Sequence, residues 1–150
     1  NYAAAMPWVL KAKAEYGANQ VLFCPNGDVQ ETGASNFILI NGDEIITKPL
    51  TDEFLHGVTR DSVLTVAKDL GYTVTERNFT VDELKAAVEN GAEAILTGTA
   101  AVISPVTSFV IDGKEIEVKS QERGYAIRKA ITDIQYGLTE DKHGWLVEVC

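Results

Sequence analysis

The pattern of hydrophobic and polar positions along the chain predicts short strands alternating with amphipathic helices. Apolar runs of four or five residues indicate buried strands, and apolar residues that recur every three or four positions indicate helices. Gly, Asn, Asp and Pro mark the turns between these segments. The predicted strands are 20–24, 29–32, 36–40, 44–47, 72–77, a strand pair within 95–106, and 115–118. The predicted helices follow Pro7 as far as Gly17, run from the 55–61 segment to Gly71, and cover 81–89 and about 124–136.

The helical segments carry apolar stripes that predict a buried face for each. The first stripe consists of Trp8, Val9, Leu10 and Ala14, and the second of Val58, Leu64, Val66, Ala67 and Leu70. Thr80, followed three residues later by Glu83, resembles a capping box at the start of the 81–89 helix.

Strands outnumber helices, and tight turns such as Asn41-Gly42-Asp43 connect many of them. We therefore predict one domain of mixed α/β (α+β) class, with a largely antiparallel, barrel-like sheet and flanking helices. A chain of 150 residues, 45% of them hydrophobic, can bury the core that such a domain needs.

Composition narrows the function classes. The formal net charge of -9 disfavours nucleic acid as a partner, because phosphate backbones require clustered Lys and Arg. No apolar run is long enough to cross a membrane, and the N-terminal residues do not resemble a signal peptide, so we expect a cytoplasmic protein, with an organelle left open. Cys24 and Cys150 are predicted to be free thiols, and His56 and His143 lie too far apart in sequence to support a metal site.

The segment from Thr97 to Ala101 is unusual because it places small side chains between two predicted buried strands. Small side chains let another molecule approach the backbone N–H groups closely. The alternative is a simple tight connection between strands, which the residues alone leave open.

Two further positions suit an anionic or cationic group. Gly57-Val58-Thr59 opens a predicted helix, where free N–H groups and the helix dipole favour a phosphate, although Thr59 could equally be a helix cap. The neighbouring Arg60-Asp61 pair is open to interpretation as an exposed ion pair. Glu31 precedes the small-residue bend Gly33-Ala34-Ser35 and, if buried, requires a cationic or hydrogen-bonding partner; a solvated edge position is the alternative.

The order and spacing of four motifs resemble the branched-chain-amino-acid aminotransferases, which belong to pyridoxal-phosphate fold type IV. The motifs are Asn1-Tyr2 before a helix, the run from Gln30 to Asn36, the run from Leu55 to Asp61, and Thr97 to Ala101 with Ser104-Pro105-Val106. The tail from Tyr136 through His143-Gly144-Trp145 is also similar to that family, so the resemblance spans essentially the whole chain. The first three motifs also resemble D-amino-acid aminotransferases and aminodeoxychorismate lyases.

The resemblance implies pyridoxal 5′-phosphate as cofactor and a role for each motif. Glu31 would pair with the pyridine nitrogen, and Tyr2 would bind the ring's phenolic oxygen and line the substrate pocket. Val58, Thr59 and Thr99 would hold the phosphate. Backbone N–H groups of Thr99, Ala100 and Ala101 would bind the substrate carboxylate.

The family's Schiff-base lysine lies a few residues before the Asn-Tyr pair, so the expectation is that this chain contains no catalytic residue. Lys11 and Lys13 lie in the wrong helical register to replace it. We expect residues 1–150 to be the C-terminal cofactor-binding domain of a larger enzyme, truncated at its N-terminus and inactive alone.

The complete enzyme is expected to be a homodimer that transfers amino groups between branched-chain amino acids and 2-oxo acids. A non-catalytic binding or assembly module is the alternative.

Overall fold

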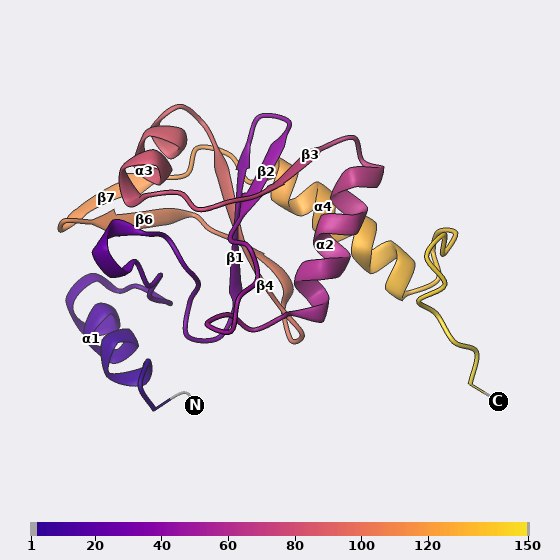
Figure 1. Cartoon of the computed structure of the whole chain (residues 1–150), viewed down its shortest axis with the longest axis horizontal. Coiled ribbons are helices and arrows are strands. Elements are labelled where there is room, and N and C mark those ends of the chain that lie inside the picture. Colours follow the sequence, from indigo (N-terminus) through magenta and orange to yellow (C-terminus); the bar gives the residue numbers. More distant parts are fainter. Residues whose placement is uncertain (1–2, 150) are drawn as a thin grey trace.

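The computed structural model describes residues 3–149, which form an open five-stranded sheet in the order β3-β2-β1-β4-β5, a separate β6-β7 hairpin and four α-helices (Figure 1). The strands are β1 (Asn36–Asn41), β2 (Glu44–Thr47), β3 (Thr73–Glu76), β4 (Glu93–Gly98), β5 (Val102–Pro105), β6 (Ser108–Ile111) and β7 (Lys114–Glu117). The helices are α1 (Met6–Tyr16), α2 (Val58–Asp69), α3 (Val81–Glu89) and α4 (Glu122–Gln135), with a short 3-10 turn at Pro25–Gly27.

Strand β1 is the centre of the sheet and is buried on both faces. Its uninterrupted apolar run supplies Ile38 and Ile40 to one core, and Phe37 and Leu39 to the other. It pairs antiparallel with β2 and β4, while β2 and β3 pair in parallel. A strand that is covered on both faces has a continuous run of hydrophobic residues. This run is why the predicted strand 36–40 agrees closely with β1.

Two layers cover the sheet. Helices α2 and α4 lie on one face, and α3 with the β6-β7 hairpin lies on the other (Figure 1). The first core includes Val63, Leu64, Ile95, Ile127 and Ile131, and the second includes Phe79, Leu84, Val88, Ala94 and Val118.

The structure confirms the mixed α/β class and the largely antiparallel sheet. The five-stranded sheet is open, with β3 and β5 at its edges, and the β6-β7 hairpin packs against only the second core, so the described residues form no closed barrel. The predicted cap is also present, since the Thr80 hydroxyl accepts the Glu83 N–H at 3.2 Å. The Glu83 carboxylate pairs with Arg77 instead of completing the capping box.

Three local predictions are wrong. The predicted strands 20–24 and 29–32 are absent, although an isolated bridge from Leu22 to Thr32 and backbone hydrogen bonds of Phe23 to residues 30 and 31 join the two segments. Helix α1 buries none of its residues, so the Trp8 and Leu10 stripe is exposed. Val58 is 82% exposed and Leu70 is 48% exposed, so both lie outside the core that the stripe of α2 joins. Periodicity shows that a helix has an apolar side but does not show what covers each turn.

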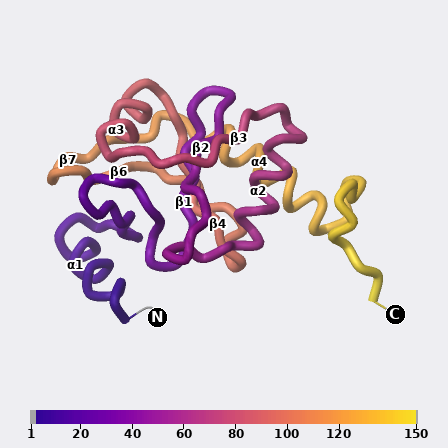
Figure 2. Tube along the Cα trace, viewed as in Figure 1, coloured from indigo at the N-terminus to yellow at the C-terminus, as the bar shows by residue number. Residues whose placement is uncertain are grey.

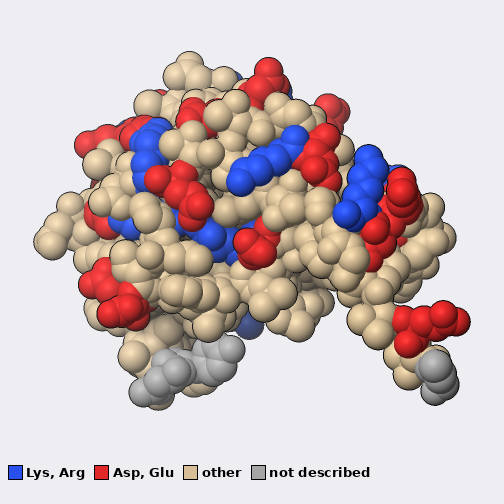
Figure 3. Space-filling view, turned by 45° about the vertical axis from the view of Figure 1, so that its right-hand side comes forward, with Lys and Arg blue, Asp and Glu red and all other residues tan. Residues whose placement is uncertain are grey.

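The segment after α4 first returns to α2, where His143 Nε2 lies 2.8 Å from Asp69 Oδ2, and its last described residues extend away from the body of the domain (Figure 2). None of the helices in the described residues has the length and apolar character needed to cross a membrane. On the face shown in Figure 3, Lys and Arg side chains lie beside Asp and Glu side chains and form no continuous basic patch.

Candidate functional site

The starts of β1 and α2 and the turn between β4 and β5 meet at one end of the sheet (Figure 1). Asn36, the first residue of β1, is the register partner of Thr97 in β4. Its side chain also donates to the carbonyl of Leu55, two residues before the N-cap of α2. Three of the four predicted motifs are therefore neighbours around Asn36.

Glu31 is half-buried beside this junction and has a specific partner, so it is not a fully solvated edge residue. The Asn36 Nδ2 group donates to Glu31 Oε2 at 2.7 Å and to the Leu55 carbonyl at 2.9 Å. Burial raises the pKa of Glu31, while the hydrogen bond from Asn36 and a backbone group of Leu55 lower it to a smaller extent. The carboxylate is thus partly desolvated, and no cation of the described residues contributes to the shift of its pKa.

The start of α2 offers free backbone donors. Gly57 is the N-cap and its position provides no side-chain cap. Thr59 is therefore not the helix cap, which was the alternative role considered for it. The first N–H groups of a helix have no partner within it, and they lie at the positive end of its dipole. Gly57 is required here, because a Cβ at this position would lie 2.2 Å from Asn36 Oδ1.

Arg60 fixes the segment that leads to this helix. It is only 3% exposed, and its Nη2 donates to the Lys48 carbonyl at 2.7 Å and to Glu76 Oε2 at 2.6 Å. The interpretation of Arg60-Asp61 as an exposed ion pair is therefore wrong, since Arg60 points inward and pairs with β3. Its guanidinium holds together the two ends of the 48–60 segment.

The turn from Thr99 to Ala101 is exposed at the end of β4, as a receiving surface requires. Gly98 brings it close to the bend after Glu31, because a Cβ at Gly98 would lie 3.7 Å from both the Ala34 carbonyl oxygen and the Ser35 Oγ. Val102, which closes the turn, has a φ of +58°. This left-handed conformation is costly for a β-branched residue, by about 1–2 kcal/mol.

The remaining predicted residues lie at the N-terminal end. Tyr2 is outside the described residues. Ala5 lies against the Glu31 bend, since a Cβ at Gly33 would approach the Ala5 Cβ to 2.6 Å. Lys11 and Lys13 are exposed on α1, and Lys11 lies 3.9 Å from Glu15.

Known proteins match this chain in sequence and in fold. The family model described as "Amino-transferase class IV" matches residues 1–109. The chain belongs to the class IV aminotransferase family. The three motifs that meet at Asn36 all lie within the matched residues.

Relatives of this class IV aminotransferase chain have consistent names. A Streptomyces coelicolor protein named "Probable branched-chain-amino-acid aminotransferase" is 40% identical, with 97% of this chain and 42% of that protein aligned. Branched-chain-amino-acid aminotransferase 6 of Arabidopsis thaliana is 34% identical over 99% of this chain and 42% of that protein.

Solved structures show the same fold. The branched-chain amino acid aminotransferase from Escherichia coli has a TM-score of 0.82 and 30% identity, over 98% of this chain and 48% of that one. The enzyme of the same name from Thermoproteus uzoniensis, solved with norvaline, has a TM-score of 0.81 and 30% identity, over 97% of this chain and 46% of that one. A further branched-chain amino acid aminotransferase structure, similar at a TM-score of 0.80, contains pyridoxamine 5′-phosphate. The present chain thus spans less than half the length of these relatives.

The class IV aminotransferase relatives imply pyridoxal phosphate, and one buried atom tests whether the site suits such a polar ligand. The Thr97 hydroxyl is buried and has no hydrogen-bond partner among the described residues. An unsatisfied buried hydroxyl costs about 1–3 kcal/mol and calls for an explanation. Thr97 lies opposite Asn36, whose amide contacts the half-buried Glu31 carboxylate and the segment before α2, and this placement fits a site built for a polar group.

Sequence reasoning missed three residues of this site. Asn36 was only part of a motif, and its role appears only once β1, Glu31 and Leu55 are placed together. Arg60 gave the signal of a charge beside a helix start, but its partner Glu76 lies in a distant strand. The positive φ of Val102 could not be predicted from the sequence, because valine rarely adopts this backbone conformation.

Proposed function

We propose that this chain is the cofactor-binding domain of a transaminase that moves the amino group between branched-chain amino acids (Leu, Ile, Val) and 2-oxoglutarate. The names of the relatives support this substrate class. The observation that carries the proposal is the meeting of Glu31, the α2 N-terminus and the β4-β5 turn around Asn36.

Pyridoxal 5′-phosphate, when bound, supplies an electron-accepting ring for cleavage of the substrate's Cα–H bond. Glu31 would pair with the protonated pyridine nitrogen of that ring. A cation there would stabilise a carboxylate that burial alone leaves unfavourably charged. Tyr2 would hydrogen-bond the ring's phenolic oxygen and line the substrate pocket.

The phosphate would rest on the N–H groups of Val58 and Thr59, with the Thr99 hydroxyl as a further donor. The free helix start and the absence of a side-chain cap on α2 support this role. Exposed N–H groups of Thr99, Ala100 and Ala101 would receive the substrate carboxylate, because their small side chains leave the backbone accessible.

The proposal assigns binding and orientation to residues 1–150 and no covalent step. The lysine that bonds the cofactor is expected upstream of Asn1 in the complete enzyme. Lys11 and Lys13 follow the Asn-Tyr pair on α1 in the wrong helical register, which supports this assignment.

The test is an assay of the protein encoded by the whole gene, with leucine and 2-oxoglutarate as substrates and glutamate as the measured product. We expect leucine-dependent glutamate formation that Glu31→Gln reduces by about 100-fold or more, as loss of one preorganised electrostatic partner does. Turnover of D-alanine in place of leucine would instead indicate a D-amino-acid aminotransferase. Absence of turnover with all amino donors would overturn the proposal.

A further inference from the structure

Asn36, at the start of β1, is a buried polar residue whose side chain joins two other segments of the chain. It is 6% exposed, and a single amide nitrogen donates to both Glu31 Oε2 and the Leu55 carbonyl. An amide NH₂ group has two hydrogens, so both of its donors are used. Rotation of the side chain would remove this donor from Glu31 Oε2 and leave the Leu55 carbonyl with only the N–H of Gly57.

The other end of the same amide is confined as well. Asn36 Oδ1 lies 2.2 Å from the position that a Cβ of Gly57 would take, and Gly57 itself is held by a 2.8 Å hydrogen bond from its N–H to the Leu55 carbonyl. The backbone on the far side is fixed by the register between Asn36 and Thr97. The contacts at both ends of the amide therefore favour the orientation that aims its donor at Glu31.

The geometry points to Asn36 as a positioning residue that holds the Glu31 carboxylate in one orientation relative to the start of α2. This inference rests on the proposed function, in which Glu31 meets the ring nitrogen while α2 receives the phosphate of the same molecule. Two groups that bind opposite ends of one rigid ligand must keep a fixed separation. Asn36 supplies that constraint, because its amide joins the two segments directly.

Asn36 also acts on the ionisation of Glu31. Its hydrogen bond favours the charged carboxylate and so lowers the pKa that burial raises. The Asn36 hydrogen bond is the largest of the contributions that lower the Glu31 pKa, so its removal leaves the effect of burial less opposed. The pKa of Glu31 should therefore rise further above its ordinary value in an Asn36 variant.

The first measurement is a pH titration of the side-chain carboxyl carbon of Glu31 by NMR in the 150-residue chain without ligand. The variants are Asn36→Ala and Asn36→Thr, the second of which suits a strand and retains volume but lacks the amide. Thr47→Val is the matched control, because Thr47 is buried and donates to the Phe37 carbonyl at 2.8 Å without contacting Glu31. We expect a higher Glu31 pKa in both Asn36 variants and an unchanged one in the control.

The second measurement is binding of pyridoxamine 5′-phosphate, which needs no covalent bond to a lysine. Binding should weaken by about tenfold in the Asn36 variants, the effect expected for one hydrogen bond to a charged group. An unchanged Glu31 pKa in every folded Asn36 variant would overturn the positioning role. If the unaltered chain binds no pyridoxamine phosphate while the Glu31 pKa still responds to Asn36, the proposed function fails and the structural coupling stands.

Discussion

At the scale of single residues, the site contains groups whose placement is unfavourable for folding. Glu31 is a carboxylate that burial makes harder to ionise, and the Thr97 hydroxyl is buried without a partner among the described residues. Val102 adopts a backbone conformation that its side chain disfavours. All three lie on or beside the segments that meet at Asn36, and such clustering is typical of functional sites.

The raised pKa of Glu31 predicts a pH-dependent stability. In the folded chain the carboxyl holds its proton to higher pH than its ordinary value of 4.5, so ionisation above that value costs free energy relative to the unfolded chain. Glu31→Gln removes the ionisation. The stability of the variant relative to the unaltered chain should increase as the pH rises from below 4.5 to neutral.

Urea unfolding of both proteins across that pH range checks this expectation. A stability difference that does not change with pH would show that burial does not disfavour the Glu31 carboxylate.

The strain at Val102 predicts an inverted order of two substitutions. Ala retains a Cβ and therefore the penalty of a positive φ, whereas Gly does not. Both variants lose the partly buried packing of the two Val102 γ-methyl groups against the α2 and α4 core, and only Gly also loses the Cβ. Val102→Gly should be more stable than Val102→Ala by about 1 kcal/mol, although Gly is ordinarily the less stable of the two.

Comparison of the two urea midpoints at equal m-value decides the matter. If Val102→Ala unfolds at the higher urea concentration, the left-handed conformation at this position is not present in solution.

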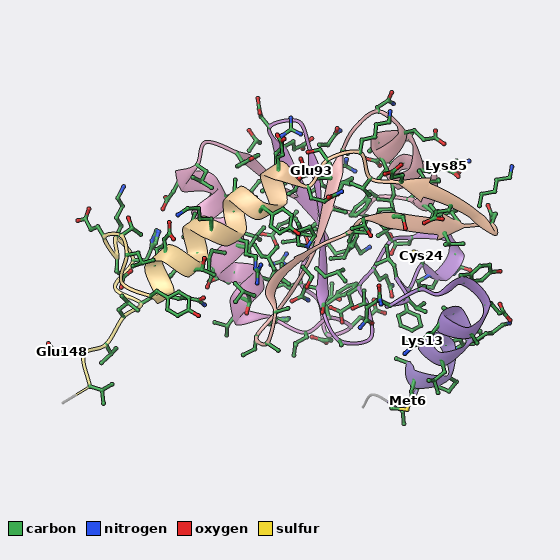
Figure 4. The ribbon with its side chains drawn as sticks, turned by 180° about the vertical axis from the view of Figure 1, so that it is seen from behind. Met6, Lys13, Cys24, Lys85, Glu93 and Glu148 are labelled. Atoms are coloured by element: carbon green, nitrogen blue, oxygen red, sulfur yellow. The ribbon has the colours of Figure 1, made fainter. Side chains whose placement is uncertain are left out.

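At the scale of elements, a buried carboxylate attaches α4 to the sheet. Glu93 begins β4 beside the N-terminal end of α4 (Figure 4), and it is 1% exposed. Its oxygens accept the N–H of Gly124 at 3.0 Å, the N–H of Arg123 at 3.2 Å and the Ser120 hydroxyl at 3.0 Å. The carboxylate thus caps the helix and compensates its own burial with hydrogen bonds.

Glu93→Ala should destabilise the domain by about 3–5 kcal/mol, because it leaves the buried donors of α4 unpaired. Glu115→Ala is the control, since Glu115 is exposed on β7 and surface changes usually stay within about 0.5 kcal/mol. Thermal or urea unfolding measures both. Equal losses for the two variants would mean that Glu93 does not hold α4.

Elements were predictable where local chemistry decides them. The apolar run of β1, the Asn41-Gly42-Asp43 turn and the Thr80 cap each act within a few residues, and all three are present. The predicted strands 20–24 and 29–32 are absent because their mutual pairing is limited to the Leu22–Thr32 bridge and the backbone hydrogen bonds of Phe23.

The motifs of the candidate site could be predicted from the sequence, but the side-chain contacts that join them could not. The small turn at Thr99 to Ala101 and the open helix start at Gly57 follow from residue types. The link through Asn36 depends on segments 5 and 19 residues away along the chain, which only the tertiary fold brings together.

At the scale of the whole molecule, the fold separates the apolar cores from the candidate site. Both cores flank the middle of the sheet, whereas the free helix start and the exposed turn lie at one end of it (Figure 1). Residues at the end of the sheet can therefore serve the candidate site, while buried apolar contacts on its two faces stabilise the fold.

A titration of the 150-residue chain with pyridoxamine 5′-phosphate, followed residue by residue through its amide N–H signals in NMR, tests this account most directly. The amides that change should be those of Glu31 and Asn36, of Gly57 to Arg60, and of Thr97 to Ala101. The hollow of about 230 Å³ between α2, α4 and the C-terminal tail, lined by Val66, Asp69 and His143, should not respond. Changes confined to that hollow, or no changes at saturating ligand, would contradict the placement of the cofactor site at this end of the sheet.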